Sequence, residues 1–167
     1  MSRDYTDAVP FPDTISLRPI GVVRAPYTER HNTPRQPGLE GPMEQGSDAI
    51  SELVFFPELL SADALRDLER FDRVWVISLF HLNGPLRKAL VRPPRGGPAR
   101  GVLATRAPHR PNPIGLSCAP LVEVRGHTVA LRGLDLLDGT PVLDIKPYIP
   151  DFDAFPAASR GWLDDFR

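Results

Sequence analysis

The proline content of this chain is the feature that most constrains its fold. The 167 residues include 20 prolines, more than twice the usual share of about 5%. They cluster at residues 34–42, 93–98 and 108–113. Proline lacks a backbone N–H donor and its ring clashes with the preceding helical turn, so these clusters exclude long helices. The chain between them must fold as short segments.

Short apolar runs between the proline clusters have the length and composition of β-strands. The alternation of side chains on both sides of Gly126 predicts a hairpin that turns there. Regular strand–helix alternation is missing, so we expect a mainly β protein, a single antiparallel β-barrel-like domain and not a Rossmann fold. The expected strands are residues 20–24, 53–56, 74–80, 102–105, 121–124, 128–136 and 142–149.

One or two short helices complete the expected fold. Ser61 can cap a helix whose apolar side includes Leu65 and Leu68, with Phe71 near its end. A weaker helical stretch runs over residues 156–166. No strand is followed by the glycine pattern of a dinucleotide-binding fold, and there is no P-loop. Any nucleotide-like cofactor would therefore have to bind through a site other than a Rossmann glycine loop or a P-loop.

The cysteine count and the apolar runs bear on compartment and metals. Cys118 is the single cysteine, so neither an internal disulfide nor a zinc ribbon is supported. The first fourteen residues lack the apolar core of a signal peptide, and no apolar run approaches the roughly 18 residues of a membrane span. We therefore expect a cytoplasmic protein without a membrane partner or a metal.

Charge is strongly segregated along the chain. The net charge is only −1, yet residues 73–122 contain no Asp or Glu and carry eight Arg and Lys side chains. A fold that gathers these cations on one face would favour a phosphate-rich partner. The alternative is that they are scattered, solvated loop residues.

The stretch at residues 105–116 is unusually rigid, because three prolines fix its backbone. Arg106, His109, Arg110 and Asn112 would then be held in a fixed relation that suits recognition of a polar ligand. The alternative is a stiff surface loop without a ligand.

Residues 133–148 place acidic groups among apolar ones. Asp138-Gly139 is a turn signal. Asp144, Lys146 and Tyr148 would share one strand face through the two-residue period, which places a carboxylate, an amine and a phenol together. Asp144 and Lys146 can equally form a structural ion pair.

Two smaller signals remain. A long loop carries Arg35 and Gln36, and loops of this length are often functional or disordered. His81 ends an apolar strand, where a lone histidine is more often a hydrogen-bonded cap than a base. No Ser, Cys or carboxylate at motif spacing indicates triad chemistry.

Five stretches of the chain occur together in a characteristic order: PRQPG at 34–38, FH at 80–81, VRPPR at 91–95, ATRAPHRPNPIGLS at 104–117 and LDLLDGTPVLDIKPY at 134–148. In these stretches the chain resembles the TrmO, or TsaA-like, family over about residues 17–150. This resemblance implies a β-barrel that binds S-adenosylmethionine without a Rossmann sheet and works as a homodimer. It also implies N6-methylation of threonylcarbamoyl-adenosine beside the anticodon of tRNA.

The resemblance also assigns roles to positions of this sequence. We expect the basic residues Arg87, Lys88, Arg92, Arg95 and Arg100 to meet the anticodon loop. Our candidates for removing the acceptor's proton are Asp138, Asp144, Tyr148 and His109. The implied cofactor contacts are Pro34, Arg35, Gln36, Phe80, His81, Arg106, Arg110, Leu116, Leu134, Asp135, Leu136, Leu137, Asp138 and Gly139.

On this basis we divide the chain into three parts. Residues 1–14 form a flexible N-terminal segment, residues 15–150 a TsaA-like barrel domain, and residues 151–167 a short tail packed on the barrel or on the partner subunit. Better-known bacterial members extend past the barrel, whereas this chain stops at Arg167. A methyl acceptor other than tRNA, or a regulatory module that binds S-adenosylmethionine without catalysis, therefore stays open.

Overall fold

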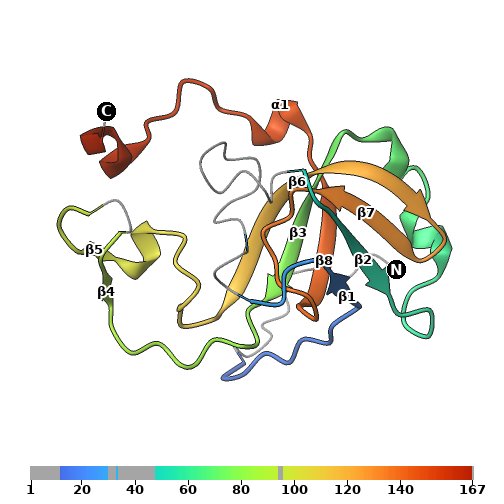
Figure 1. The fold of residues 1–167 in the computed structure, drawn as a ribbon, viewed down its shortest axis with the longest axis horizontal. Helices are drawn as coiled ribbons and strands as arrows, with labels where there is room; N and C mark the ends of the chain where they lie inside the picture. Colours follow the sequence, from blue (N-terminus) through green and yellow to red (C-terminus); the bar gives the residue numbers. More distant parts are fainter. Residues whose placement is uncertain (1–11, 30–32, 34–47, 94–95, 167) are drawn as a thin grey trace, which may run out of the picture.

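A computed structural model describes residues 12–29, 33, 48–93 and 96–166. Six strands close an antiparallel barrel in the order β1-β2-β7-β6-β3-β8 (Figure 1). This architecture confirms the prediction of a mainly β, barrel-like fold. The six strands are β1 (Gly21–Arg24), β2 (Ile50–Phe55), β3 (Arg73–Leu79), β6 (Ile114–Arg125), β7 (Thr128–Arg132) and β8 (Pro141–Pro147).

The remaining elements are short and lie outside the barrel wall. Strands β4 (Leu90–Val91) and β5 (Arg100–Gly101) form a small two-stranded sheet, which extends to the left of the barrel in Figure 1. The helical elements are short: α1 (Pro150–Asp153) and the 3₁₀ helices η3 (Ala62–Leu65), η4 (Leu68–Arg70), η5 (Val102–Ala104) and η6 (Gly161–Phe166).

The barrel interior is filled by every second side chain of its strands, as the pleat of a strand requires. In β2 these are Ser51, Leu53 and Phe55, and in β3 Val74 and Val76, all at most 1% exposed. Apolar residues from β1, β7, β8 and the turn after β7 join them in one core cluster. The alternation visible in the sequence therefore sets which side chains face inward.

Several expected elements are confirmed. The β6–β7 hairpin turns at Gly126, whose φ of 54° suits a residue without a Cβ, and its last pair is Arg125 with Thr128. The Ser61 side chain accepts a hydrogen bond from the Asp63 N–H at 3.3 Å. The helix that follows is a pair of 3₁₀ turns, however, because Asp67 has a left-handed backbone with φ 66°.

Other expected boundaries are wrong. Residues 102–105 were expected as a strand but lie in and just after η5, where the Thr105 N–H returns to the Val102 carbonyl at 3.2 Å. Strand β7 ends at Arg132 because Gly133 turns the chain with φ 62°. The expected helix at 156–166 is confined to η6.

Strand β6 begins seven residues earlier than expected, and its two halves have different partners. Residues 114–120 pair with β3, and the stretch from Leu121 onward pairs with β7. The N–H groups of Leu121 and Phe80 donate across the β3 ladder to Asp72 and Pro113, each at 2.8 Å. Backbone groups in an antiparallel ladder alternate in direction, so the odd-numbered residues of β6 face β3.

The even-numbered residues of this half, including Leu116 and Cys118, consequently point their peptide groups to the opposite edge. None of the described strands pairs with that edge before Leu121. Pro120 is tolerated in the strand because its missing N–H lies on the side away from β3. We call this side of residues 114–120, which faces away from β3, the free edge of β6. On it the Ile114 N–H donates to the Asn112 carbonyl at 2.7 Å.

The tail after α1 returns to the β4–β5 region, and Figure 1 shows the C-terminal turn beside β5. The Trp162 Nε1–H donates to the Ala104 carbonyl at 2.8 Å. The Arg100 guanidinium lies 5.4 Å from the centre of the Trp162 ring and forms an ion pair with Asp165 at 2.6 Å. The tail thus contacts the turn that leads directly into the proline-rich loop.

We predict that Trp162→Ala loosens this turn. Losing one hydrogen bond and one cation–π contact removes about 1–2 kcal/mol of local stability, which corresponds to roughly tenfold faster amide exchange. Hydrogen exchange at Val102 and Thr105 measures the effect. Leu163→Ala, on the same turn, is the matched control. Equal exchange in the two variants would contradict the prediction.

Candidate functional site

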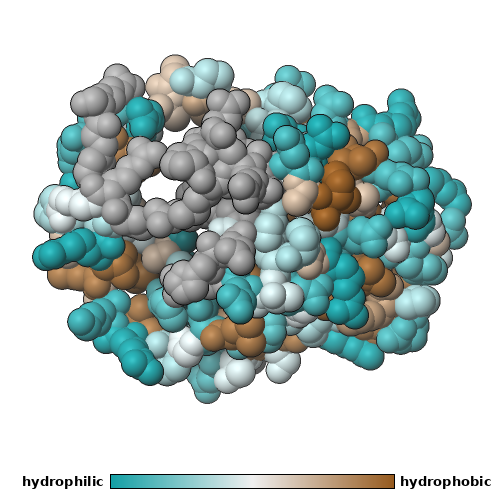
Figure 2. All heavy atoms as spheres, in the orientation of Figure 1, coloured by the Kyte–Doolittle hydropathy of each residue, from teal (hydrophilic) through white to brown (hydrophobic). Residues whose placement is uncertain are grey.

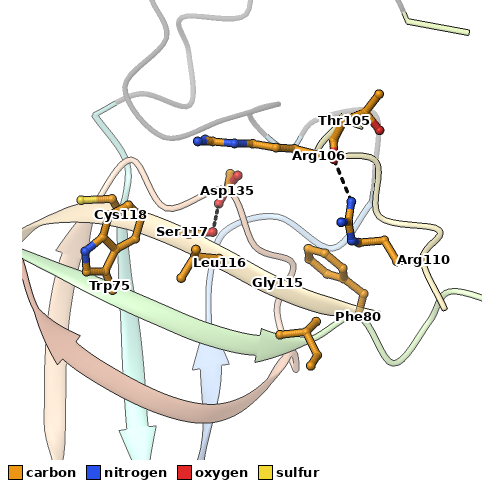
Figure 3. Close-up of a pocket in the computed structure, with 11 residues that line it drawn as sticks. Trp75, Phe80, Thr105, Arg106, Arg110, Gly115, Leu116, Ser117, Cys118 and Asp135 are labelled. Carbon is orange, nitrogen blue, oxygen red and sulfur yellow. Dashed lines mark hydrogen bonds between the residues drawn. The ribbon is translucent and has the colours of Figure 1, made fainter. Parts of the chain in front are cut away.

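A cavity of about 320 Å³ opens beside the free edge of β6 (Figure 3). This volume lies within the range of small-molecule sites. The cavity mixes cationic, anionic and aromatic groups. Its walls are Thr105, Arg106 and Arg110 of the proline-rich loop, residues 114–118 of β6, Trp75 and Phe80 at β3, and Asp135 after β7.

The proline-rich loop is held by Arg110. Its Nη1 donates to the Thr105 carbonyl at 2.8 Å and to the Val102 carbonyl at 3.3 Å. Arg110 therefore uses much of its donor capacity on the loop backbone. Arg106, in contrast, is exposed and forms no ion pair with any described residue, and in Figure 3 its side chain extends past Asp135. Within the described residues, the Arg106 guanidinium is therefore the cation of this loop that can pair with an anionic ligand.

Asp135 is the half-buried acid of the cavity. The Ser117 hydroxyl, which is 3% exposed, donates to its Oδ1 at 2.5 Å. Burial raises the pKa of Asp135 to about 6. The hydrogen bond from Ser117, a backbone hydrogen bond and the charge of Arg106 act in the opposite direction. The carboxyl group therefore titrates close to neutral pH.

Gly115 allows the aromatic wall to form. A Cβ added there would lie 2.4 Å from the Ser78 Oγ and 2.8 Å from the Phe80 Cζ. Both distances are well below van der Waals contact. A side chain at this position would therefore displace the Phe80 ring from the cavity or separate β6 from β3.

The structure brings together five of the expected cofactor contacts at this cavity and separates others from it. Leu134 and Leu136 are core residues, 0% and 2% exposed. His81 is exposed and is not among the described lining residues. Pro34, Arg35 and Gln36 lie outside the described residues. The five contacts at the cavity are Phe80, Arg106, Arg110, Leu116 and Asp135.

The turn that carries the remaining expected contacts, Leu137 to Gly139, is tied to β1 and the residues after it. Asp138 Oδ1 accepts the Ala25 N–H at 3.1 Å, and its Oδ2 lies 3.8 Å from Arg24 Nη1. The Gly139 N–H donates to the Val23 carbonyl at 2.9 Å. Asp138 thus has structural partners outside the cavity.

Two further candidate bases, Asp144 and Tyr148, also have partners of their own. Asp144 forms a partly exposed ion pair with Lys146, with 2.7 Å between the carboxylate oxygen and Nζ. Of the two roles that the sequence left open for these residues, the structure therefore shows the ion pair. The Tyr148 ring contacts Trp75, with 5.9 Å between ring centroids. Neither side chain is among the described residues that line the cavity. His109 is exposed and is not among them either.

The basic residues divide into two groups. Arg87, Lys88 and Arg92 are exposed, and within the described ranges none of them forms an ion pair. Arg100 is engaged by Asp165 and Trp162, and Arg95 lies outside the described residues. Within the same ranges no group of three or more His, Cys, Asp or Glu residues could hold a metal, and no helix is long and apolar enough to span a membrane.

Sequence reasoning missed Trp75, Ser117 and Cys118 as lining residues. Counting the hairpin register from the Gly126 turn would not have found the Ser117 contact. The pairs nearest the turn, such as Arg125 with Thr128, extrapolate to Leu136 opposite Ser117, but the register shifts by one residue between Leu121 and Glu123. Trp75 gave no local signal either.

The fold and cavity define a class of protein: a closed antiparallel barrel with a polar cavity beside the free edge of one strand. The family model of the tRNA-methyltransferase O N-terminal domain matches residues 22–154. The chain belongs to this family. The match includes every wall of the described cavity.

Individual relatives agree with this assignment. A tRNA (adenine(37)-N6)-methyltransferase of Escherichia coli is 47% identical over 86% of this chain and 61% of its own length. A probable S-adenosyl-L-methionine-binding protein of Pyrococcus abyssi is 40% identical over 92% of this chain and 78% of its own. The crystal structure of TrmO from Pseudomonas aeruginosa is 40% identical, with a TM-score of 0.73 over 90% of this chain and 63% of that one. This chain therefore spans less than two thirds of the Escherichia and Pseudomonas proteins.

We predict that Asp135→Asn stabilises the protein at alkaline pH. The folded pKa of about 6 exceeds the usual 3.8, so the folded state binds more protons than the unfolded state between these values. Stability then falls as pH rises from about 4 to about 6, and the cost persists above that range. We expect the variant to gain on the order of 2 kcal/mol at pH 8. The gain should disappear below about pH 4.

Urea unfolding at pH 8 and at pH 4 measures this difference. Asp144→Asn is the matched control, because it removes a carboxylate on the outside of the barrel that is paired with Lys146. A wild type that is more stable than Asp135→Asn at pH 8 would show that burial does not penalise the charge.

Proposed function

We propose that this chain is an S-adenosylmethionine-dependent methyltransferase. The proposed reaction is N6-methylation of threonylcarbamoyl-adenosine beside the anticodon of tRNA. The observation that carries the proposal is the cavity itself, which lies wholly within the segment matched by the tRNA-methyltransferase family. Relatives named as tRNA (adenine(37)-N6)-methyltransferases from Escherichia coli and human, 47% and 43% identical, support it.

The residues around the cavity fit the chemistry of the cofactor. S-adenosylmethionine has a carboxylate, which the exposed Arg106 guanidinium can pair with. Its adenine edge needs backbone donors and acceptors, and the free edge of β6 offers those of Leu116 and Cys118. Its sulfonium is favoured beside an aromatic ring, and Phe80 and Trp75 line the cavity.

The cofactor supplies a methyl group that the sulfonium already activates. The work left to the protein is to hold the acceptor nitrogen in line and to exclude water, a positioning effect worth several orders of magnitude in rate. Pro34, Arg35, Gln36, His81 and the Leu134 to Gly139 turn remain predicted contacts of the cofactor. Asp138, Asp144, Tyr148 and His109 remain candidates for assisting proton removal.

RNA binding would use the acid-free middle of the chain. Arg87, Lys88 and Arg92 are exposed between β3 and β5 and can contact anticodon-loop phosphates. Arg95 and Arg100 belong to the same predicted group, although the ion pair with Asp165 leaves Arg100 less available.

We also propose that the chain acts in the cytoplasm as a homodimer. The single free thiol, Cys118, is compatible with a reducing compartment. Large apolar side chains are exposed near the two-stranded β4–β5 sheet and the cavity. They include Leu90, Leu103 and Leu116, which are 60%, 73% and 60% exposed. Figure 2 shows apolar atoms at the left of the view, where Figure 1 places β4 and β5. A second copy could cover such a surface.

The alternative is a module that binds S-adenosylmethionine without catalysis, or a methyltransferase with another acceptor. The Pyrococcus relative favours this alternative, because its name states only binding and this chain covers 78% of it. Cofactor binding without transfer to any RNA would distinguish it from the proposed reaction.

We predict that the protein transfers labelled methyl from S-adenosylmethionine to tRNA carrying threonylcarbamoyl-adenosine, and that Arg106→Ala reduces transfer roughly 10- to 150-fold at a subsaturating cofactor concentration. The reason is the loss of a charge-assisted pair, worth about 1.5–3 kcal/mol. Scintillation counting of purified tRNA measures the transfer. Arg66→Ala, whose side chain is exposed and paired with Asp63, is the control and should retain full rate.

We further predict that replacing Arg87, Lys88 and Arg92 together by Ala weakens tRNA binding and lowers its salt dependence. Each phosphate contact contributes about 0.7–0.9 to the slope of log affinity against log salt, so the slope should fall by roughly 2–3. Filter binding across a salt series gives both slopes. An unchanged slope would mean that these side chains do not contact phosphate.

A further inference from the structure

Within the described residues that line the cavity, Asp135 is the only carboxylate. We propose that Asp135 is the catalytic base, whose carboxylate takes the proton from the acceptor nitrogen as that nitrogen is methylated. This inference rests on the proposed methyltransferase function. It gives Asp135 a role different from the cofactor contact that the family resemblance implies.

The reaction requires such a group. The lone pair of an exocyclic adenine nitrogen is delocalised into the ring, so the nitrogen is a weak nucleophile. As its bond to the methyl carbon forms, the carbon–sulfur bond breaks and its electron pair goes to sulfur, which becomes a neutral thioether. The nitrogen must lose its proton to finish neutral. We assign that proton to the Asp135 carboxylate, which releases it to solvent afterwards.

The geometry suits this transfer. Asp135 follows the turn at Gly133 and reaches the cavity beside the free edge of β6 (Figure 3). The hydrogen bond from Ser117 to Oδ1 at 2.5 Å fixes the orientation of the carboxylate. An ionised carboxylate accepts several hydrogen bonds, so this contact leaves capacity for the acceptor's N–H.

The other candidate bases are committed elsewhere. Asp138 accepts from Ala25 and lies near Arg24, Asp144 is paired with Lys146, and Tyr148 contacts Trp75. These three side chains and the fourth candidate, the exposed His109, are all absent from the described residues that line the cavity. The burial of the Cys118 thiol, which does line it, raises its pKa and keeps it protonated. Among the described residues that line the cavity, Asp135 is therefore the group in position to take the proton.

The surroundings of Asp135 set its pKa in a range that suits a base. The groups that act on it are Ser117 from β6 and Arg106 from the proline-rich loop, and both oppose the effect of burial on its pKa. With a pKa of about 6 it is ionised at neutral pH yet more basic than an ordinary aspartate. A base with a pKa near the working pH is the effective kind.

The decisive variant is Asp135→Asn, which keeps the shape and an acceptor for Ser117 but cannot take a proton. We expect kcat for methyl transfer to fall about 100-fold or more, while calorimetric affinity for S-adenosylmethionine stays within about threefold. Transfer at the wild-type rate would overturn the inference. Loss of cofactor affinity in proportion to the lost rate would also overturn it, because Asp135 would then hold the cofactor.

Ser117→Ala gives a readout that a purely structural role would not move. Removing the hydroxyl takes away a group that lowers the pKa of Asp135, so the acidic limb of the rate profile should move to higher pH. Carbon NMR of the Asp135 carboxyl in the absence of cofactor should show a midpoint near 6, and a higher one in Ser117→Ala. A midpoint near 4, or no change on removing Ser117, would contradict the tuning.

The outcomes separate the two proposals. No transfer by the wild-type protein to any RNA, with cofactor binding intact, would overturn the proposed function and this inference with it. Transfer by the wild type that Asp135→Asn retains in full would overturn this inference alone.

Discussion

The divided pairing of β6 is the constraint on which the candidate site depends. One strand pairs with β3 over its first half and with β7 over its second, so the barrel closes while none of the described strands pairs with the free edge of β6. Exposed strand edges are a liability in most sheets. Here the free edge borders a cavity whose other described walls come from the proline-rich loop, the end of β3 and the turn after β7.

Rigidity around this edge has several independent sources. Prolines limit the backbone of the loop, Arg110 ties its carbonyls together, and the tail supports the preceding turn through Trp162. The acidic group of the cavity is placed less favourably. Asp135 is held in surroundings that disfavour its charge, a cost of stability that functional sites commonly carry.

Much of the fold could be predicted because the inward side chains alternate and the turns use glycine. The Gly126 hairpin and the strands around Val23, Leu53 and Val74 are of this kind. The predicted boundaries of strands were wrong where tertiary contacts, and not the local sequence pattern, determine where a strand begins. The start of β6 at Ile114 depends on pairing with Leu79, and no local signal distinguishes it from the rigid loop before it.

The sequence by itself determined the class of fold, the rigid loop and the family resemblance, because prolines, glycines and alternation act locally. Only the tertiary structure decided which acidic groups lie together with which cations. Asp144 lies between apolar neighbours as Asp135 does, yet it is paired with Lys146, and Asp138 of the next turn is tied to β1 and Ala25. The closure of the barrel alone places Asp135 against Ser117 and near Arg106, since burial and charge proximity arise from residues distant along the chain.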